Sequence, residues 1–484
     1  MTASKSEFEM PIPFGVFADT GQPLDAIDDA ALTAFVEQGP EPEQDYLEAK
    51  IDNSAHYGVI GDVEGNDLAQ AGWAVMWAPG VDPKIEEALQ PLLEHRRAQV
   101  GDETLFKSFE GATGYQPGDT AKTWLARQKV RMDVVDPALG VPYYLLIVAP
   151  PEAIPFEFQY SLDIYWAVGR LWFSTADEFR HYADSVVRYE TMPEAPTARQ
   201  IAVFAPQHDF DEATQSFCKQ VATPLANGID TSPPLGQRQK FALQSFIGDP
   251  ATKNTLNAIL TGAIPNGAPA LLFSGSHGMV FRPDDSRQTD QQGAMVCQDW
   301  GGYGAITAEQ WYAASDLPAQ AKVHGLIHFL FACYGAGWPQ FDNFNRRDKV
   351  PRPIAPKPLL GRLPQALLAH PNGGALAVIG HIDRAWAYSF QSDKSGPQTQ
   401  GFRDVIGRLL RGERLGQATD QFNIRWACLS TDLADLLDRT AGLELMERDK
   451  RKMAQAWVAR DDARNYIIFG DPAVKLRTDD MPVL

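Results

Sequence analysis

The chain has 484 residues, of which 44% are hydrophobic and 22% charged, values that fit a folded soluble protein and exclude wholesale disorder. Its net charge of −19 repels phosphate backbones and anionic lipid, so we expect neither nucleic-acid binding nor a membrane-surface role. No apolar run could span a bilayer, the N-terminus has no apolar signal segment, and four cysteines are too few for a disulfide scaffold, so we expect a cytoplasmic protein.

The first part of the chain is predicted to contain an extension and a first α/β unit. Residues 1–60 mix proline, glycine and acidic side chains and predict an N-terminal extension with one helix near 25–38. Residues 61–195 predict a first, non-catalytic α/β subdomain. Its expected strands are 72–77 and the continuously apolar run 143–149, and its expected helices are 83–99 and 174–189.

A proline-containing stretch without apolar periodicity, 191–196, predicts the boundary to a catalytic subdomain at 196–484. Strand-like runs are expected at 201–205, 270–273, 326–332, 375–379 and 466–469. Amphipathic helices are expected between them, at 211–226, 252–260, 359–369, 402–410 and 422–439. Strands that alternate with helices predict an α/β fold with a mostly parallel sheet covered on both faces.

Two of the predicted strands end in residues that can carry chemistry. The run 270–273 is followed by Ser-Gly-Ser-His277-Gly278, and the run 326–332 by Cys333-Tyr-Gly-Ala-Gly. In an open α/β sheet, reactive groups gather beyond the carboxyl ends of the strands. An imidazole can activate a neighbouring thiol, and the N–H groups of Gly278 and Cys333 can stabilise an oxyanion. Taken singly, however, the cysteine reads as a small core residue and the histidine as part of a turn.

The order and spacing of His277 and Cys333 resemble those of caspases, whose histidine lies about 50 residues before a Q-A-C-x-G signature. Here Ala332-Cys333-Tyr334-Gly335 keeps the A-C-x-G part, and Phe331 stands in place of the glutamine. The chain resembles the caspase-like (clan CD) cysteine peptidases, and more closely their bacterial gingipain-type and CHAT-type members. The motifs that carry this resemblance are Leu272–Gly278, Phe331–Gly337, Gly373–Gly380, Tyr466–Ala473 and, upstream, Tyr143–Val148, Ile154–Pro155 and Val168–Arg170.

The resemblance implies a three-layer α/β/α sandwich in two subdomains and a cysteine endopeptidase that needs no cofactor. It implies that His277 is the base, that Cys333 is the nucleophile, and that the backbone N–H groups of Gly278 and Cys333 form the oxyanion hole. Protein or peptide substrates would be cleaved through an acyl-enzyme. A regulatory protein partner is compatible with this function.

Residues that set specificity are harder to choose. Related peptidases often use a charged residue at the tip of the first catalytic strand, where Asp209 and Asp211 follow 201–205. An acidic pocket would select Arg or Lys. Asp211 is also placed to cap the helix that begins near Glu212, and we prefer that role for it. Asp342 is a weaker pocket candidate, and Trp386 would either wall the substrate pocket or pack in the core.

The stretch 339–358 is long and contains no predicted element, as in functional loops. Its basic residues Arg346, Arg347 and Lys349 are candidates for a self-cleavage or regulatory site, and an ordinary surface loop is an equal alternative. The sequence has neither H-E-x-x-H nor C-x-x-C, so no metal site is predicted. Asp471, in a Gly-Asp-Pro turn, is expected to be structural.

The sequence is also compatible with two other functions. The chain could be a CHAT-like signalling or binding module that no longer cleaves, although core packing does not require a His277–Cys333 pair. It could also be a cysteine acyl hydrolase or acyltransferase that acts on small molecules, in which case it would turn over simple thioesters but not peptides.

Overall fold

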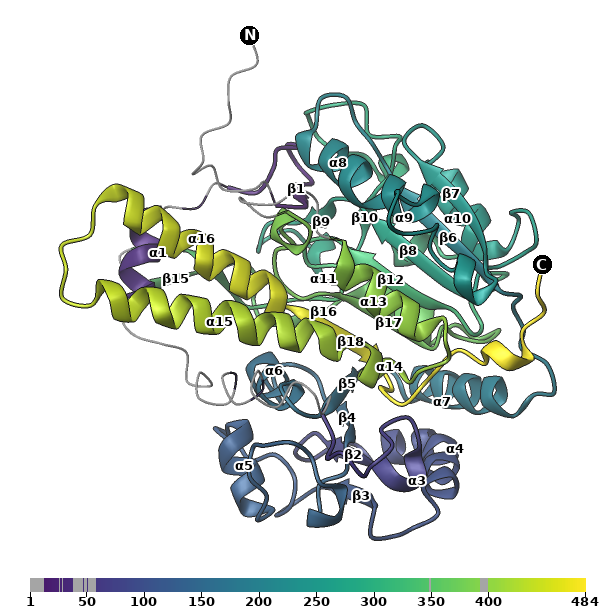
Figure 1. Ribbon diagram of the computed structural model, residues 1–484. Coiled ribbons are helices and arrows are strands. Elements are labelled where there is room, and N and C mark those ends of the chain that lie inside the picture. The colour runs from purple at the N-terminus through teal and green to yellow at the C-terminus, as the bar shows by residue number, and fades with distance from the viewer. Residues whose placement is uncertain are drawn as a thin grey trace.

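The centre of the molecule is a single sheet. The computed structural model describes residues 13–25, 27, 29–37, 47, 50, 58–347, 350–391 and 399–484, with the backbone alone at 29–31, 345–347 and 350. Its 10-stranded sheet has the order β3-β2-β4-β5-β18-β17-β12-β8-β6-β7 (Figure 1). The strands are β2 (Trp73–Trp77), β3 (Phe106–Phe109), β4 (Tyr144–Val148), β5 (Ala167–Leu171), β6 (Gln200–Ala205), β7 (Ala242–Ile247), β8 (Leu271–Gly275), β12 (Ile327–Phe331), β17 (Ala377–His381) and β18 (Tyr466–Gly470).

The strands run in two opposed blocks. Among the described strands of this sheet, every neighbouring pair is parallel except β17 and β18. The strands β2 to β5 therefore run with β18, and opposite to β6, β7, β8, β12 and β17. As a result, the carboxyl ends of β8, β12 and β17 meet at one edge of the sheet.

The apolar runs in the sequence became the central strands. Every residue of β4, β6, β8, β12 and β17 is buried, as parallel strands covered on both faces require. The predicted α/β class with a mostly parallel sheet is confirmed. Strands from both predicted subdomains join in this one sheet, because β18 lies between β5 and β17.

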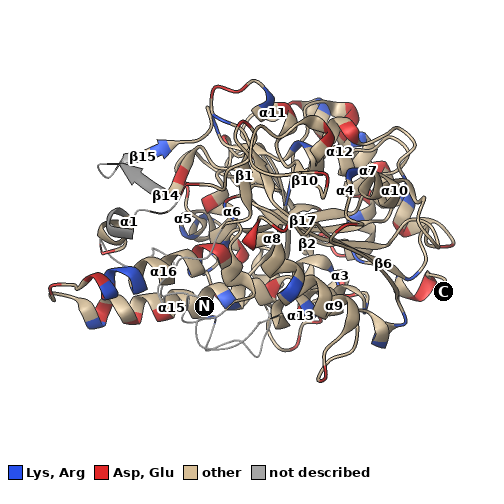
Figure 2. Ribbon diagram, turned by 90° about the horizontal axis from the view of Figure 1, so that it is seen from above, with Lys and Arg blue, Asp and Glu red and all other residues tan. Residues whose placement is uncertain are grey.

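Helices cover both faces of the sheet. Figure 2 shows α4, α7, α10 and α12 on one side and α8, α9, α13 and α15 on the other, which gives three layers. The helices are α1 (Asp29–Val36), α3 (Leu68–Ala71), α4 (Pro83–Val100), α5 (Ala121–Arg127), α6 (Phe156–Asp163), α7 (Ala176–Thr191), α8 (Glu212–Phe217), α9 (Thr223–Asn227), α10 (Lys253–Thr261), α11 (Arg287–Gln291), α12 (Arg362–Leu368), α13 (Gln400–Leu409), α14 (Leu415–Ala418), α15 (Asp420–Thr440) and α16 (Glu447–Arg464). Of these helices, none combines the length and the apolar character that crossing a bilayer demands.

The sequence defines several helix ends through their capping residues. Asp82 accepts a hydrogen bond from the N–H of Lys84 at the start of α4, and Pro83 occupies the first turn. Gly101 ends α4 with a φ of 71°, a left-handed conformation that glycine adopts without strain. Thr175 and Glu178 form a capping box at the start of α7. These local signals explain why α4 and α7 were predictable.

A second, four-stranded sheet ties the N-terminal segment to the catalytic half. It consists of β1 (Gly15–Phe17), β9 (Gly278–Val280), β10 (Met295–Val296) and β11 (Trp311–Tyr312). β1 pairs in parallel with β9, with Gly15 opposite Gly278. The predicted extension therefore returns to the strand that follows His277.

The expectation of a structureless stretch at 339–358 is wrong. β14 (Phe341–Arg347) and β15 (Val350–Pro353) form an antiparallel hairpin, and β16 (Leu359–Leu360) pairs with β13 (Gly337–Trp338). The ring of Phe344 packs against Trp386 at 5.3 Å between centroids, so the hairpin is anchored by an aromatic contact distant in sequence. Of the proposed processing residues, Lys349 lies outside the described residues, and so do the side chains of Arg346 and Arg347.

Candidate active site

His277 and Cys333 lie just beyond the ends of adjacent parallel strands. β8 and β12 pair in register, with Gly275 opposite Phe331, so the residues after them emerge at the same edge of the sheet. Both side chains are almost completely buried, His277 with 0% and Cys333 with 1% of its surface exposed. The topology thus brings together two residues that lie 56 positions apart in the sequence.

The backbone N–H groups of Gly278 and Cys333 point to one acceptor. Each donates a hydrogen bond of 2.9 Å to the carbonyl oxygen of Phe14. A Cβ at position 278 would overlap the carbonyl oxygen of Cys333, so only glycine allows the two backbones to approach this closely. Two N–H groups converging on one carbonyl oxygen have the geometry of an oxyanion hole.

Residues 13–15 are bound to this edge through main-chain atoms. The N–H of Phe14 donates to the carbonyl oxygen of Ala385 at 2.9 Å, and Pro13 forms an antiparallel bridge with Trp386. Gly15 lies against the nucleophile candidate, because a Cβ built on it would be 3.1 Å from the Sγ of Cys333. The peptide between Phe14 and Gly15 therefore lies beside the thiol, with its carbonyl oxygen in the N–H pair.

The side chain of Phe14 fills an aromatic pocket and has no exposed surface. Its ring centroid lies 4.9 Å from that of Phe331, 5.8 Å from Phe217, 6.0 Å from Phe390 and 5.9 Å from His277. Phe331 is the residue that replaces glutamine in the caspase signature. The phenylalanine that replaces the glutamine of the signature therefore forms one wall of this pocket.

Asp211 is paired with His277. Its carboxylate lies 3.0 Å from Nε2 of His277 and also accepts a 2.8 Å hydrogen bond from the N–H of Thr214, at the start of α8. Burial favours the neutral acid, but the charge of His277 and the hydrogen bonds outweigh it and hold the pKa of Asp211 well below its usual range. Asp211 therefore caps α8, as predicted, and faces the imidazole as well.

The thiol of Cys333 is shielded from water. Its Sγ accepts a 3.2 Å hydrogen bond from the N–H of Ala385, and burial raises its pKa well above the ordinary value. Burial at this site therefore favours the neutral thiol of Cys333 over the thiolate.

The remaining specificity candidates lie elsewhere. Asp209 is exposed at the surface after β6. Asp342 is buried and forms a 2.7 Å ion pair with Arg384. The side chain of Trp386 packs in a core cluster with Phe344, although its backbone borders the segment at Pro13. The site thus gathers Asp211, His277, Gly278 and Cys333 without Asp209 or Asp342.

Sequence reasoning missed the residues that fill and line the site, namely Phe14, Gly15, Phe217, Ala385 and Phe390. Each of the phenylalanines reads as an ordinary core residue, and the bonds of Ala385 are made by its backbone. The one available signal was the change from glutamine to Phe331, which introduces an aromatic ring beside the cysteine.

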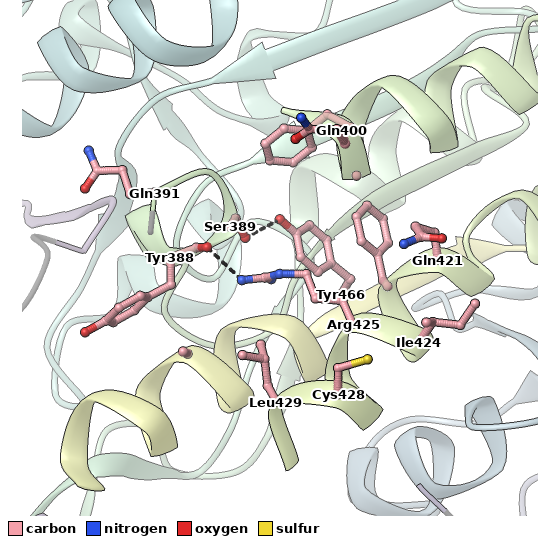
Figure 3. A pocket seen from close by; sticks show the side chains of 14 residues that line it. Tyr388, Ser389, Gln391, Gln400, Gln421, Ile424, Arg425, Cys428, Leu429 and Tyr466 are labelled. Carbon is pink, nitrogen blue, oxygen red and sulfur yellow. Dashed lines mark hydrogen bonds between the residues drawn. The ribbon is translucent and has the colours of Figure 1, made fainter. Parts of the chain in front are cut away.

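A separate pocket of about 590 Å³ lies between α13 and α15 (Figure 3). Arg425 donates to the carbonyl oxygen of Tyr388 at 2.7 Å, and Ser389 and Tyr466 are hydrogen-bonded at 2.8 Å. Its wall includes Cys428, the exposed thiol. Neither His277 nor Cys333 lines this pocket, so it is distinct from the site that holds Phe14.

The sheet topology, with a cysteine and a histidine beyond the ends of adjacent strands, defines the chain as a three-layer α/β protein. The model of peptidase family C25 matches residues 142–477, well over half of the chain, and the chain belongs to this family. It is therefore a cysteine-type peptidase that acts on protein substrates. The family match ends before the C-terminus and begins after the segment that holds Phe14.

Solved structures that are similar to this chain include the following two. One, described as the structure of a protease, is 14% identical, with a TM-score of 0.48 over 84% of this chain and 78% of the other. The other is the separase–securin complex of Saccharomyces cerevisiae, 12% identical, with a TM-score of 0.29 over 68% of this chain and 15% of the other. No curated protein matches the sequence.

Proposed function

We propose that the chain is an endopeptidase in which Cys333 is the nucleophile and His277 the general base and acid. The N–H groups of Gly278 and Cys333 stabilise the oxyanion, and Asp211 positions the imidazole through Nε2. The four free cysteines fit a reducing compartment, and we propose the cytoplasm.

The proposed reaction has two halves. His277 takes the proton of the Cys333 thiol, and the thiolate attacks the scissile carbonyl carbon, whose oxygen becomes negative between the two N–H groups. The imidazolium then protonates the leaving amine, and the C–N bond breaks to give a thioester. Water, deprotonated by His277, hydrolyses the thioester, and the thiol recovers its proton.

The observation that carries this proposal is the position of the Phe14 carbonyl. Its oxygen lies 2.9 Å from the nitrogen of each donor, and a Cβ built on the next residue, Gly15, would lie 3.1 Å from the sulfur of Cys333. A main-chain carbonyl oxygen thus accepts from the two N–H groups that we assign to the oxyanion hole. A buried cysteine with only a packing role would not require a bound peptide and two converging donors beside it.

We expect peptidyl acyloxymethyl ketones to label Cys333 and no other cysteine. A Cys428→Ser background removes the exposed thiol, and intact mass and peptide mapping measure the label. In this background, a further Cys333→Ser substitution should abolish both the labelling and the cleavage of fluorogenic peptides. Cys297→Ser is the matched control, since Cys297 is equally buried but bonded elsewhere.

Equal labelling with and without Cys333 would remove this residue from the mechanism. The same proteins also separate the alternatives. Turnover of simple thioesters without peptide cleavage would indicate a small-molecule acyl hydrolase. Peptides that differ only in the residue before the scissile bond decide whether the enzyme prefers Arg or Lys there.

A further inference from the structure

The segment around Phe14 is bound as a substrate would be. It contacts the site through main-chain atoms on both sides of the peptide bond between Phe14 and Gly15. The N–H of Phe14 donates to the carbonyl oxygen of Ala385, and the carbonyl oxygen of Phe14 accepts from Gly278 and Cys333. After this bond, β1 pairs with β9. Pairing through the main chain accepts many sequences, whereas a pocket for one side chain gives selectivity. In this site, the one side chain held in a closed pocket beside the thiol is that of Phe14.

The pocket is built to hold an aromatic ring. Phe217 lies directly over Gly275, where a Cβ would overlap its ring, so the strand end leaves room for this wall. Phe217 stacks on Phe331 at 5.2 Å and 17°, and Phe390 closes the third side at 5.8 Å from Phe217. A guanidinium or ammonium among these rings would lose its hydration. The carboxylate beside the ring of His277, that of Asp211, is already engaged by His277 and Thr214.

We propose that this aromatic pocket is the specificity subsite for the residue before the scissile bond, and that Phe14 occupies it in the resting chain. The enzyme therefore prefers substrates with phenylalanine at that position, and residues 13–17 must leave before such a substrate can enter. This inference rests on the proposed function of Cys333 and His277.

The raised pKa of Cys333 is consistent with a closed resting state, because burial under the segment disfavours the thiolate. The closed state also explains why position 15 is a glycine. A Cβ there would lie 2.9 Å from the Cβ of Cys333, so any larger residue would push the segment away from the sulfur.

Two variants test the closed state, one by changing the side chain in the pocket and the other by adding a side chain next to Cys333. Phe14→Asp places a charge among aromatic rings, and Gly15→Val introduces a collision with Cys333. Each substitution is made in the full chain that carries Cys428→Ser. Each should raise kcat/KM for a peptide substrate with phenylalanine before the scissile bond by at least about tenfold, because residues 13–17 have left the site in a larger fraction of the molecules. Alkylation of Cys333 by iodoacetamide should accelerate in parallel.

Phe17→Ala is the matched control. Phe17 belongs to the same strand, but its ring lies under the guanidinium of Arg282 at 5.4 Å and outside the pocket. We expect this substitution to leave both rates near those of the parent chain. Equal acceleration by Phe17→Ala would show that loosening β1 is sufficient and that the ring of Phe14 has no special part.

The specificity is tested with peptides that differ only in the residue before the scissile bond: Phe, Leu, Arg, Lys or Asp. Phenylalanine should exceed arginine and lysine by roughly 100-fold in kcat/KM. Preference for Arg or Lys, or no gain in Phe14→Asp and Gly15→Val, would overturn this inference and leave the peptidase intact. If no peptide is cleaved and Cys333 stays unreactive even in the opened variants, the proposed function itself fails.

Discussion

Asp211→Asn is expected to fold normally and to lose most of its peptidase activity. Asparagine can still accept the hydrogen bond from the N–H of Thr214, so the cap of α8 is kept. What disappears is the negative charge 3.0 Å from Nε2 of His277, which orients the ring and favours the imidazolium formed when the thiol loses its proton. We expect kcat to fall by about 100-fold or more with little change in KM.

Two further variants separate positioning of the histidine from helix capping. Asp211→Ala removes both functions, so it should match Asp211→Asn in activity and lose about 1 kcal/mol more stability. Asp209→Asn, two residues earlier and exposed, should change kcat/KM by no more than about twofold. If Asp211→Asn retained full activity, Asp211 would be a helix cap alone. If Asp209→Asn selectively impaired cleavage after Arg or Lys, the acidic pocket inferred from the sequence would be supported.

The fold was largely predictable because its central strands are apolar on both faces. β4 appears in the sequence as an uninterrupted apolar run, and β12 as a run interrupted only by His328, since helices cover the sheet on each side. The weaker elements were not visible. β14 and β15 form a hairpin in a stretch rich in proline and basic residues, and their anchor is the contact of Phe344 with Trp386. A contact between residues so far apart leaves no periodicity in the local sequence.

The sequence predicted only those residues of the candidate site that have a reactive side chain and directly follow a buried strand. His277 and Cys333 follow buried strands and have side chains that packing alone does not demand. Asp211 was recognised as a cap because capping is local, whereas its pairing with His277 depends on the order of β6 and β8 in the sheet. Phe14 could not be identified, because its carbonyl is recognised through main-chain atoms more than 260 positions away.

Asp471 was expected to be structural, and its surroundings give the reason. It accepts hydrogen bonds from Nε1 of Trp73 at 3.0 Å and from Nε of Arg96 at 2.7 Å. Arg96, on α4, also donates to both carboxylate oxygens of Glu190 on α7, at 2.6 and 2.8 Å. One buried guanidinium thus joins two helices to the turn after β18.

Arg96→Met is expected to lower the free energy of unfolding by about 3–5 kcal/mol, because it leaves two buried carboxylates without their cation. Arg97→Met is the matched control. Arg97 is 48% exposed and pairs with Glu103 at 3.1 Å, so its loss should cost no more than about 1 kcal/mol. Urea midpoints of the two variants and the parent chain, measured at pH 7, test this difference.

The cost of losing Arg96 should also depend on pH. Burial raises the pKa of Glu190, but the charge of Arg96 and the hydrogen bonds of His95 and Arg96 outweigh it and bring that pKa below its ordinary value of 4.5. The stabilisation from ionised Glu190 is therefore complete above pH 4.5 and is lost as the pH falls below it. Without Arg96, the carboxylate loses the charge that lowers its pKa most, while burial still raises that pKa, so the variant gains stability relative to the parent as the carboxylate takes up its proton. The gap between the two urea midpoints should accordingly narrow from pH 7 to pH 4. A gap that stayed constant would mean that Arg96 stabilises the fold by packing and not by its charge.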